Sequence, residues 1–469
     1  MKKSVFGLVV TTRGFFNPKL AQVGREQLMQ KLDSMGYEYV VLSVEDTQYG
    51  CVETYEDAEK CANLFKQHRD KIDGIIITAP NFGDEIAAVN SVHLADLNVP
   101  VLVHACDDDV DKMDLSHRRD SFCGKLSICN NLYQYGIKFT VTEQHTSDIL
   151  SDTFTKDIEA FDRTCRVVNG MRGARIAQIG TRPAAFQTVR FSEKLLQKSG
   201  ITVVPVDLSD IYAAAEGLKG NPDVKDRIAA IKAYGHVAPH IKEDRIERSA
   251  RLSMAVERFL DENKCVAGAM QCWTSVVENY GCAACLPMSL ESEKGRAMAC
   301  ETDINGALSM YALNLASGRP SGYLDWNNSF LDDRDMCIMI HCSNYPKSFM
   351  GREFEISNLD VMGAAKGEEI CFGACKAQIA PGPMTFAKIT TDENIGQMKA
   401  YVGEGEFTDD PVVTPGAPGV VRIKGLQKLM KYICYNGFEH HVSMNRSNSA
   451  DVINEALGKY LGWQVYKHE

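Results

Sequence analysis

The feature that most constrains the fold of this chain is a repeated alternation of short apolar runs with longer segments of helical periodicity. In residues 1–145, near-continuous apolar runs at 4–10, 74–78 and 99–103 are separated by segments whose apolar residues recur at helical spacing. A strand that is apolar at nearly every position is buried on both faces, as in parallel sheets covered by helices. The pattern therefore predicts α/β layers, with ligand-binding residues placed directly after the strands.

The same alternation restarts after a long helical segment at residues 151–172. From residue 336 the texture changes, because alternating and β-branched runs are separated by clusters of Pro and Gly. We therefore predict an α/β protein with two flavodoxin-like α/β domains, at residues 1–165 and 166–330. A C-terminal antiparallel β-barrel-like domain is predicted at residues 331–469.

Charge and hydropathy argue against several classes of partner. The 469 residues carry a formal net charge of -11, which does not favour binding to nucleic acid or to an anionic membrane surface. No segment approaches the roughly 18 apolar residues that a membrane span requires. The apolar run at 5–10 is too short for the core of a secretory signal. We expect a cytoplasmic protein with no nucleic-acid or membrane partner.

The cysteines offer a rival interpretation. The chain has 16 of them, and two pairs, Cys282 with Cys285 and Cys371 with Cys375, are closely spaced. A structural zinc site needs four ligands, and no second pair of matched spacing is evident. Reduced core thiols are the simpler interpretation in a large chain expected in the cytoplasm. A zinc-dependent or redox function is the less favoured alternative.

Acids and histidines stand at the ends of several predicted strands. A lone acid at such a place more often lies near a helix start, so the joint placement matters more than any single residue. Carboxylates together with one or two imidazoles suit manganese or a similar divalent ion better than structural zinc. The sequence therefore predicts a metal site drawn from this set: Glu278, Glu301, Asp303, His341 and the pair His440–His441.

A second group of candidate site residues is basic. Arg118 and Arg119 lie in a loop that precedes a predicted helix at 124–131, and Arg13 follows the first strand. Donors gathered at a helix start suit an anion or several hydroxyls. A capped helix with a solvated basic turn explains the same pattern. In the functional interpretation, Lys125 joins the three arginines in binding a negatively charged substituent.

Several of these residues belong to blocks whose order and spacing are shared with a known family. The blocks are residues 13–16, 118–125, 271–273, 278, 300–306, 341–344, 381–385 and 440–441. In these blocks the chain resembles the L-fucose isomerase and L-arabinose isomerase family, especially its fucose-isomerase-like branch. The resemblance extends over nearly the whole length of the chain.

The resemblance implies a manganese ion at the junction of the domains. It also implies a homo-oligomer, trimeric or hexameric, in which a neighbouring subunit completes each active site. The implied metal ligands are Glu278, one acid of the next pair, and His441. In fucose isomerases that acid falls on Asp303, whereas in arabinose isomerases it falls on Glu301 and His341 is added. Asp303 is favoured because residues 303–306 look like the fucose branch.

The implied activity is aldose–ketose isomerisation, in which a proton moves between C1 and C2 through a cis-enediol. By the same resemblance, Glu278 and Asp303 would transfer the proton and His441 would anchor the ion. Trp273 would pack against the sugar. The basic residues add an acidic hexose such as sulfoquinovose to L-fucose, D-arabinose and L-arabinose as expected substrates. A non-catalytic sugar-binding sensor is the alternative, and it would bind sugar without a metal.

Overall fold

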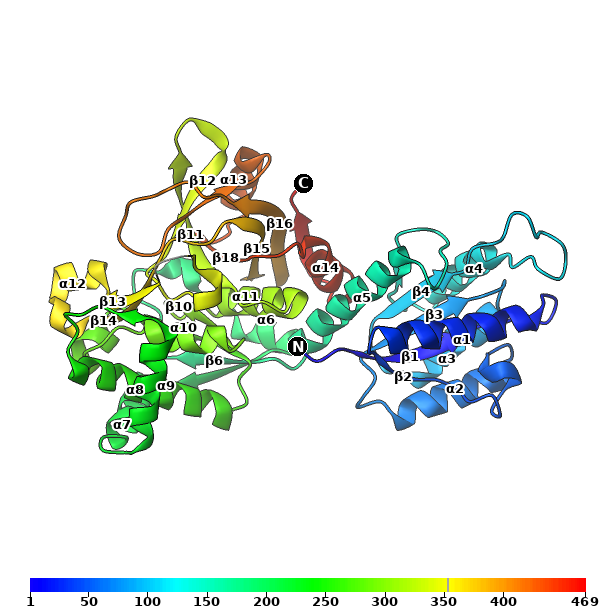
Figure 1. Cartoon of the computed structure of the whole chain (residues 1–469), viewed down its shortest axis with the longest axis horizontal. Coiled ribbons are helices and arrows are strands. Elements are labelled where there is room, and N and C mark those ends of the chain that lie inside the picture. Colours follow the sequence, from blue (N-terminus) through cyan, green and yellow to red (C-terminus); the bar gives the residue numbers. More distant parts are fainter. Residues whose placement is uncertain (352–353) are drawn as a thin grey trace. The chain divides into compact units, whose positions relative to one another are not determined.

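The structure, a computed structural model, describes residues 1–351 and 354–469. The chain divides into two compact units, residues 1–169 and residues 170–469 (Figure 1). The first unit contains a parallel sheet, and the second contains a further parallel sheet, a large mixed sheet and a small three-stranded sheet. The α/β class, with parallel sheets before a β-rich C-terminal region, is therefore confirmed. The division into three domains at residues 165 and 330 stays a prediction.

The first unit is a parallel sheet with the strand order β2-β1-β3-β4-β5. β1, β3 and β4 are buried at every position, as their apolar sequences predict. Val9 and Ile77 face a core shared with α2 and α3, whereas Phe6 and Leu8 face a core shared with α1 and α5. Helices therefore cover both faces of the sheet.

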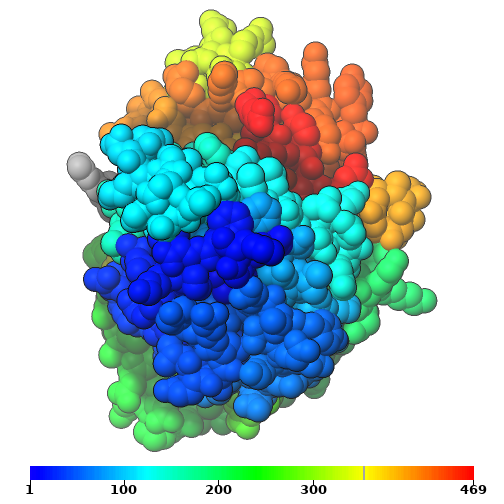
Figure 2. Space-filling view, turned by 90° about the vertical axis from the view of Figure 1, so that its right-hand side faces the viewer, coloured from blue at the N-terminus to red at the C-terminus, as the bar shows by residue number. Residues whose placement is uncertain are grey.

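Figure 2 shows one face of this unit in blue and cyan. The strands are β1 (Val5–Val10), β2 (Glu38–Val40), β3 (Gly74–Ala79), β4 (Val101–Ala105) and β5 (Thr140–Val141), and the helices are α1 (Pro18–Ser34), α2 (Tyr55–Gln67), α3 (Glu85–Ala95), α4 (Ser121–Gln134) and α5 (Asp152–Met171).

The second unit begins with a four-stranded parallel sheet in the order β10-β9-β6-β7. β9 and β10 carry mostly small residues, which let helices approach the sheet closely. The strands are β6 (Arg175–Ile179), β7 (Thr202–Val206), β9 (Ala267–Met270) and β10 (Ala297–Cys300), and the helices are α6 (Glu193–Lys198), α7 (Leu208–Gly217), α8 (Asp223–Tyr234), α9 (Glu243–Glu262), α10 (Cys285–Glu293) and α11 (Ile304–Ser317).

The large sheet of the second unit has the strand order β15-β18-β11-β12-β17-β16-β19. Its pairings are antiparallel except for β16 with β19, which is parallel. β15 also pairs with β16. The strands are β11 (Gly322–Phe330), β12 (Asp333–Ile340), β15 (Gly382–Asp392), β16 (Gln397–Phe407), β17 (Gly419–Arg422), β18 (His441–Asn445) and β19 (Gln464–Lys467).

The small sheet joins distant parts of the same unit in the order β14-β13-β8. Its strands are β8 (His236–Val237), β13 (Glu355–Asn358) and β14 (Phe372–Lys376), and the remaining helices of the unit are α12 (Asp360–Lys366), α13 (Leu426–Tyr435) and α14 (Ala450–Asn454). A π-helical turn, η3 (Val276–Tyr280), follows β9.

Candidate metal centre

A tight turn between β10 and α11 carries two of the predicted acids. Glu301 and Thr302 both adopt a positive φ of 59°, a region that side chains other than glycine rarely occupy. Asp303 follows as the N-cap of α11, and its Oδ1 accepts the backbone N–H of Gly306 at 2.8 Å. The turn buries both carboxylates, since Glu301 is 3% and Asp303 is 0% exposed.

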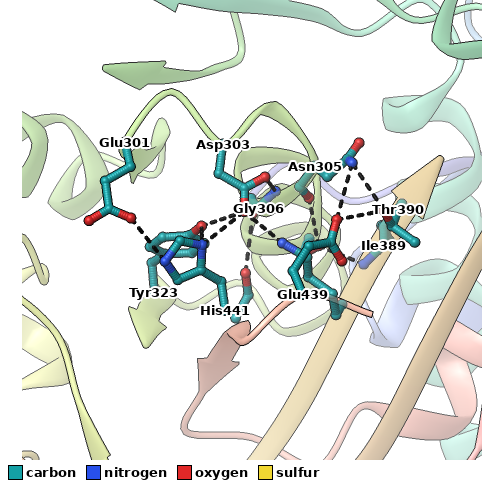
Figure 3. A network of polar contacts seen from close by, with 12 residues as sticks. Glu301, Asp303, Asn305, Gly306, Tyr323, Ile389, Thr390, Glu439 and His441 are labelled. Carbon is teal, nitrogen blue, oxygen red and sulfur yellow. Dashed lines mark hydrogen bonds and ion pairs between the residues drawn. The ribbon is translucent and has the colours of Figure 1, made fainter. Parts of the chain in front are cut away.

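His441, the first residue of β18, lies between these two acids (Figure 3). Its Nε2 is 2.9 Å from Glu301 Oε2, and its Nδ1 is 3.3 Å from Asp303 Oδ2. Burial by itself would lower the pKa of His441, but the hydrogen bond to Asp303 and the close contact with the Glu301 carboxylate raise it to about 9. Burial likewise raises the pKa of Glu301, but the contact with His441 outweighs it and lowers that pKa. The imidazole is thus held by acids on both of its nitrogens.

A third residue, His341, follows the end of β12 and completes a group of side chains that could bind a metal ion. One donor atom each from Glu301, His341 and His441 lies within 4.8 Å of the others. His341 Nδ1 is buried and has no hydrogen-bond partner, and Glu301 Oε2 makes its contact with His441 without hydrogen-bond geometry. Buried polar atoms are nearly always hydrogen-bonded, so the unpaired Nδ1 of His341 needs a partner other than a hydrogen-bonding group of the described chain. One carboxylate and two imidazoles fit a divalent transition-metal ion.

Asp303 faces a different set of groups. Its Oδ2 accepts a hydrogen bond from the Lys388 ammonium of β15 at 2.7 Å and another from the Tyr323 hydroxyl of β11. Lys388 and Tyr323 are both fully buried. Burial would raise the pKa of Asp303, but the positive charge of Lys388 lowers it well below its usual range. Asp303 is therefore ionised and already fully engaged.

On its exposed side, the centre is flanked by a carboxylate and aromatic rings. Asp325 Oδ1 lies 3.4 Å from His441 Nε2 and 3.7 Å from His440 Nε2. The Phe186 ring packs against Trp273 at 5.5 Å and against His440 at 6.1 Å between ring centroids. The side chains of Asp325 and His440 are 29% and 46% exposed. Solvent therefore reaches this side of the centre.

The structure does not bring Glu278 into this group of donors. Its side chain is 39% exposed and forms an ion pair with Lys366 at 2.6 Å, which lowers its pKa. Its predicted roles as metal ligand and proton-transfer residue, like those of the other site residues, stay predictions. Trp273, by contrast, lies at the exposed side of the centre: its ring packs against Phe186, and Phe186 in turn packs against His440.

The four predicted basic residues lie in the first unit, and each has a partner there. Arg13 pairs with Glu85 and packs on the Phe82 ring, and Arg118 Nε contacts Asp120 at 2.8 Å. Arg119 donates to the carbonyl of Pro80 at 2.7 Å, and the buried Lys125 donates to Thr142 Oγ1 at 2.7 Å. Within the described ranges, Arg119 is the member of the four that has neither an acidic partner nor full burial.

The cysteines form no disulfide. Cys272 and Cys300 lie close enough to Glu301 to make a second group of possible ligands. The hydrogen bond to Cys272 and burial raise the pKa of Cys300 well above its usual value. Burial likewise raises the pKa of Cys285 and Cys375. Buried cysteines with raised pKa values are typical of core thiols, the simpler interpretation of the sequence.

Sequence reasoning missed Tyr323, Asp325, Lys388 and Phe186. Lys388 had a signal, because a lysine inside an otherwise apolar and β-branched strand must find a buried partner. The partner, Asp303, is 85 positions away and could not be named from spacing. In addition, among the residues described, no helix combines the length and apolar character needed to cross a membrane.

Comparison with known families places this chain among the sugar isomerases. Residues 7–172 match the fucose/sulfoquinovose isomerase N-terminal domain, and residues 339–469 match the L-fucose isomerase C-terminal domain. The chain belongs to the fucose isomerase-like family, as its sequence blocks predicted.

Several relatives of the chain are named sulfoquinovose isomerase. The sulfoquinovose isomerase of Alkalicoccus urumqiensis is 26% identical over 312 residues, which is 66% of this chain and 68% of that protein. The sulfoquinovose isomerase of Priestia aryabhattai is 23% identical over 178 residues, 38% of this chain and 40% of that protein. That of Clostridium sp. (strain MSTE9) is 26% identical over 169 residues, 36% of this chain and 38% of that protein.

Among solved structures, a D-allose-bound periplasmic solute-binding protein of Actinobacillus succinogenes has 14% identity and a TM-score of 0.17, covering 68% of this chain and 93% of that chain. A TM-score this low does not bear on the fold or the function of this chain.

Proposed function

We propose that this chain converts an aldose into its ketose at a divalent metal centre, with sulfoquinovose or a closely related acidic hexose as the substrate. The observation that carries the proposal is the convergence of donor atoms from Glu301, His341 and His441, with His341 Nδ1 buried and unpaired, in a chain of a sugar-isomerase family. The substrate is suggested by the three relatives described above, each of which is named sulfoquinovose isomerase.

In this proposal Glu301, His341 and His441 hold the ion, for which Mn²⁺ is the expected species. A divalent ion there would stabilise negative charge that develops on the two sugar oxygens during isomerisation. Asp303, the acid favoured from the resemblance, is assigned to orienting His441 instead, because Lys388, Tyr323 and Gly306 already occupy its oxygens. The alternative ligand set is Glu278, Asp303 and His441.

Two variants distinguish the ligand sets when metal binding is measured by calorimetry on metal-stripped protein. In the favoured set, Glu301→Gln abolishes measurable Mn²⁺ binding, and Glu278→Gln leaves it within about twofold. If Glu278→Gln abolishes binding and Glu301→Gln does not, the alternative set from the resemblance holds. Neither substitution changes side-chain volume, so folding is preserved in both proteins and is checked by circular dichroism.

Glu278 is the proton-transfer residue of this proposal. Its ion pair with Lys366 involves side chains that are 39% and 41% exposed. Such a solvent-exposed pair contributes little to stability, so the carboxylate can leave Lys366 for a bound sugar. We expect Glu278→Gln to abolish exchange of the C2 hydrogen of the sugar with solvent, followed by NMR in D₂O. Exchange at the normal rate in this variant would remove Glu278 from the proton transfer.

The sugar ring is expected to lie against Trp273 and Phe186, since aromatic faces pack well on the apolar face of a sugar. For the acidic substituent, Arg119 is the favoured member of the four basic residues because its guanidinium has no acidic partner among the described residues. Arg119→Ala should lower kcat/KM on sulfoquinovose more than on a neutral aldose. Arg118→Ala, whose cation is matched by Asp120, is the control. Equal losses on both sugars would remove the anion-binding role.

The reaction itself is tested with metal-stripped protein, with and without added Mn²⁺, on sulfoquinovose, L-fucose, D-arabinose and L-arabinose. Formation of ketose is followed by NMR. Mn²⁺-dependent conversion of sulfoquinovose in preference to the neutral sugars supports the proposal. Binding of a sugar without metal and without turnover would instead support the sugar-binding sensor.

The large sheet is proposed to be barrel-like, and this is supported by the pairing of β15 with β16, which returns the ladder to its first strand. We also propose a homo-oligomer, trimeric or hexameric, with a cytoplasmic location, as the family resemblance implied. Analytical ultracentrifugation measures the assembly directly, and a monomer at micromolar concentration would contradict it.

A further inference from the structure

A row of buried polar groups runs from β15 to the candidate metal centre. Lys388 Nζ lies 2.7 Å from Asp303 Oδ2, the Tyr323 hydroxyl contacts the same oxygen, and the hydroxyl also contacts His441 Nδ1 (Figure 3). Lys388, Asp303 and Tyr323 are fully buried, and His441 is 1% exposed. Four polar groups that share no solvent must satisfy one another, so their hydrogen atoms have a defined arrangement.

The direction of each hydrogen bond follows from the groups themselves. The Lys388 ammonium only donates, and the ionised Asp303 carboxylate only accepts. The Tyr323 hydroxyl has a single hydrogen and donates it to Asp303, so its oxygen accepts the N–H of His441 Nδ1. Nδ1 therefore carries a hydrogen, and Nε2 is the nitrogen that faces Glu301 at 2.9 Å.

The Asp303 carboxylate is also fixed in its plane. Its second oxygen, Oδ1, accepts the backbone N–H of Gly306 at 2.8 Å in the first turn of α11. Glu439, the other buried acid nearby, makes its hydrogen bonds with Thr390 and Asn305. Within the described residues, the one ion pair recorded for Lys388 is therefore with Asp303.

We propose that Lys388 is a positioning residue for the metal centre: its ammonium holds Asp303 in the orientation that fixes the ring and the tautomer of His441. This rests on the proposed function in taking His441 as a metal ligand, and it holds for Asp303 as an outer partner of His441 or as a ligand itself, because partners that orient ligating carboxylates act in the same way. Ligand imidazoles are commonly oriented by a hydrogen bond from their other nitrogen to a carboxylate. Loss of such an outer partner typically costs 10–100-fold in metal affinity.

The same sheet provides a matched control. Lys399, on β16, is 9% exposed and pairs with Asp392 at the same N–O distance of 2.7 Å. Neither residue of that pair contacts Asp303, Tyr323 or His441 among the hydrogen bonds and ion pairs described. Lys388→Met and Lys399→Met each remove one ammonium from a lysine–aspartate pair in one sheet. Any difference between them reports on what the Lys388 pair does, rather than on loss of an ion pair in general.

The test is Mn²⁺ binding to the metal-stripped full chain, measured by calorimetry with circular dichroism as the check on folding. We expect Lys388→Met to weaken binding by about 10–100-fold, Lys388→Arg to restore part of the affinity, and Lys399→Met to stay within about twofold of wild type. Equal losses in the two methionine variants, or none in Lys388→Met, would overturn the proposal. If Lys388→Met does not fold, Tyr323→Phe, which removes the linking hydroxyl, must show the same 10–100-fold loss.

A second readout separates this proposal from the proposed function. In a crystal structure of metal-free Lys388→Met we expect the Asp303 carboxylate to turn away and the hydrogen bond from His441 Nδ1 to Tyr323 to be lost. An unchanged arrangement of these three side chains would refute the positioning role. If wild-type protein binds no Mn²⁺ but the variant shows the displaced ring, the positioning role holds and the metal-dependent function fails.

Discussion

His104, at the carboxyl end of β4, makes the stability of the first unit depend on pH, with lower stability in acid. The imidazole is fully buried, and its two nitrogens have opposite roles. Nε2 donates to the carbonyl of Ser147 at 2.9 Å, so Nδ1 carries no hydrogen in the neutral ring and accepts the hydroxyl of Thr78 at 2.9 Å. Burial lowers the pKa of His104 to about 3, and the charge of Lys125 acts in the same direction.

The sign of the pH effect follows from comparing the folded and unfolded chains. An unfolded histidine titrates near pH 6.5, so below that pH the unfolded chain binds a proton at His104 while His104 of the folded chain stays neutral. The stability contributed by neutral His104 is present above pH 6.5 and is lost as the pH falls toward 3. Each pH unit in that window costs about 1.4 kcal/mol, so the change from pH 7 to pH 5 removes roughly 2 kcal/mol.

The assay is urea unfolding at pH 7 and pH 5, comparing wild type with His104→Asn, which cannot titrate. The variant should be less stable at pH 7 because it loses packing against Phe154, whose ring lies 4.3 Å from the imidazole. Its stability should nevertheless fall by about 2 kcal/mol less than that of wild type between the two pH values. An equal fall in both proteins would refute the argument, as would an NMR titration of His104 near pH 6.5.

Three further outcomes are expected. Gly306→Ala would place a Cβ 2.3 Å from the Tyr323 ring, so it should lower the unfolding free energy by about 1–3 kcal/mol and weaken Mn²⁺ binding. Gly217→Ala, whose Cβ would meet nothing within 4 Å, should leave Mn²⁺ binding unchanged, and calorimetry measures Mn²⁺ binding to both variants. Thr54→Ala removes the capping box of α2 and should cost about 1 kcal/mol in urea unfolding, and a cost near zero would show that the cap is replaceable. Phe186→Ala removes the ring beside Trp273 and should raise KM more than it lowers kcat, so an unchanged KM contradicts a sugar-contacting role.

The parallel sheets could be predicted because burial on both faces leaves a visible mark in the sequence. β1 is apolar along its whole length, β3 and β4 are apolar except at Thr78 and His104, and all three strands are buried along their whole length. The large C-terminal sheet was predicted more coarsely. Its neighbouring strands, such as β11 with β18, pair across more than a hundred positions, and no local pattern specifies those partners.

The rule that polar residues after strands gather at a site worked unevenly. It selected Glu301 and His341, which the structure brings together with His441, the first residue of β18. It selected Glu278 equally, and that side chain points to Lys366 instead. His104 also ends a strand, yet it is a satisfied core residue, because α5 places Phe154 over it. The sequence shows which residues leave a strand but not which ones another segment will cover.

The turn at Glu301 and Thr302 has a consequence for how a ligand would be received. Two successive residues other than glycine in the left-handed region cost about 1–3 kcal/mol each, and the rest of the fold must overcome that cost. Folding of the chain therefore fixes the orientation of the Glu301 carboxylate before any ion or sugar binds. A Thr302→Gly chain would fold with less strain, but it would have a looser carboxylate, and each binding event would then have to order it.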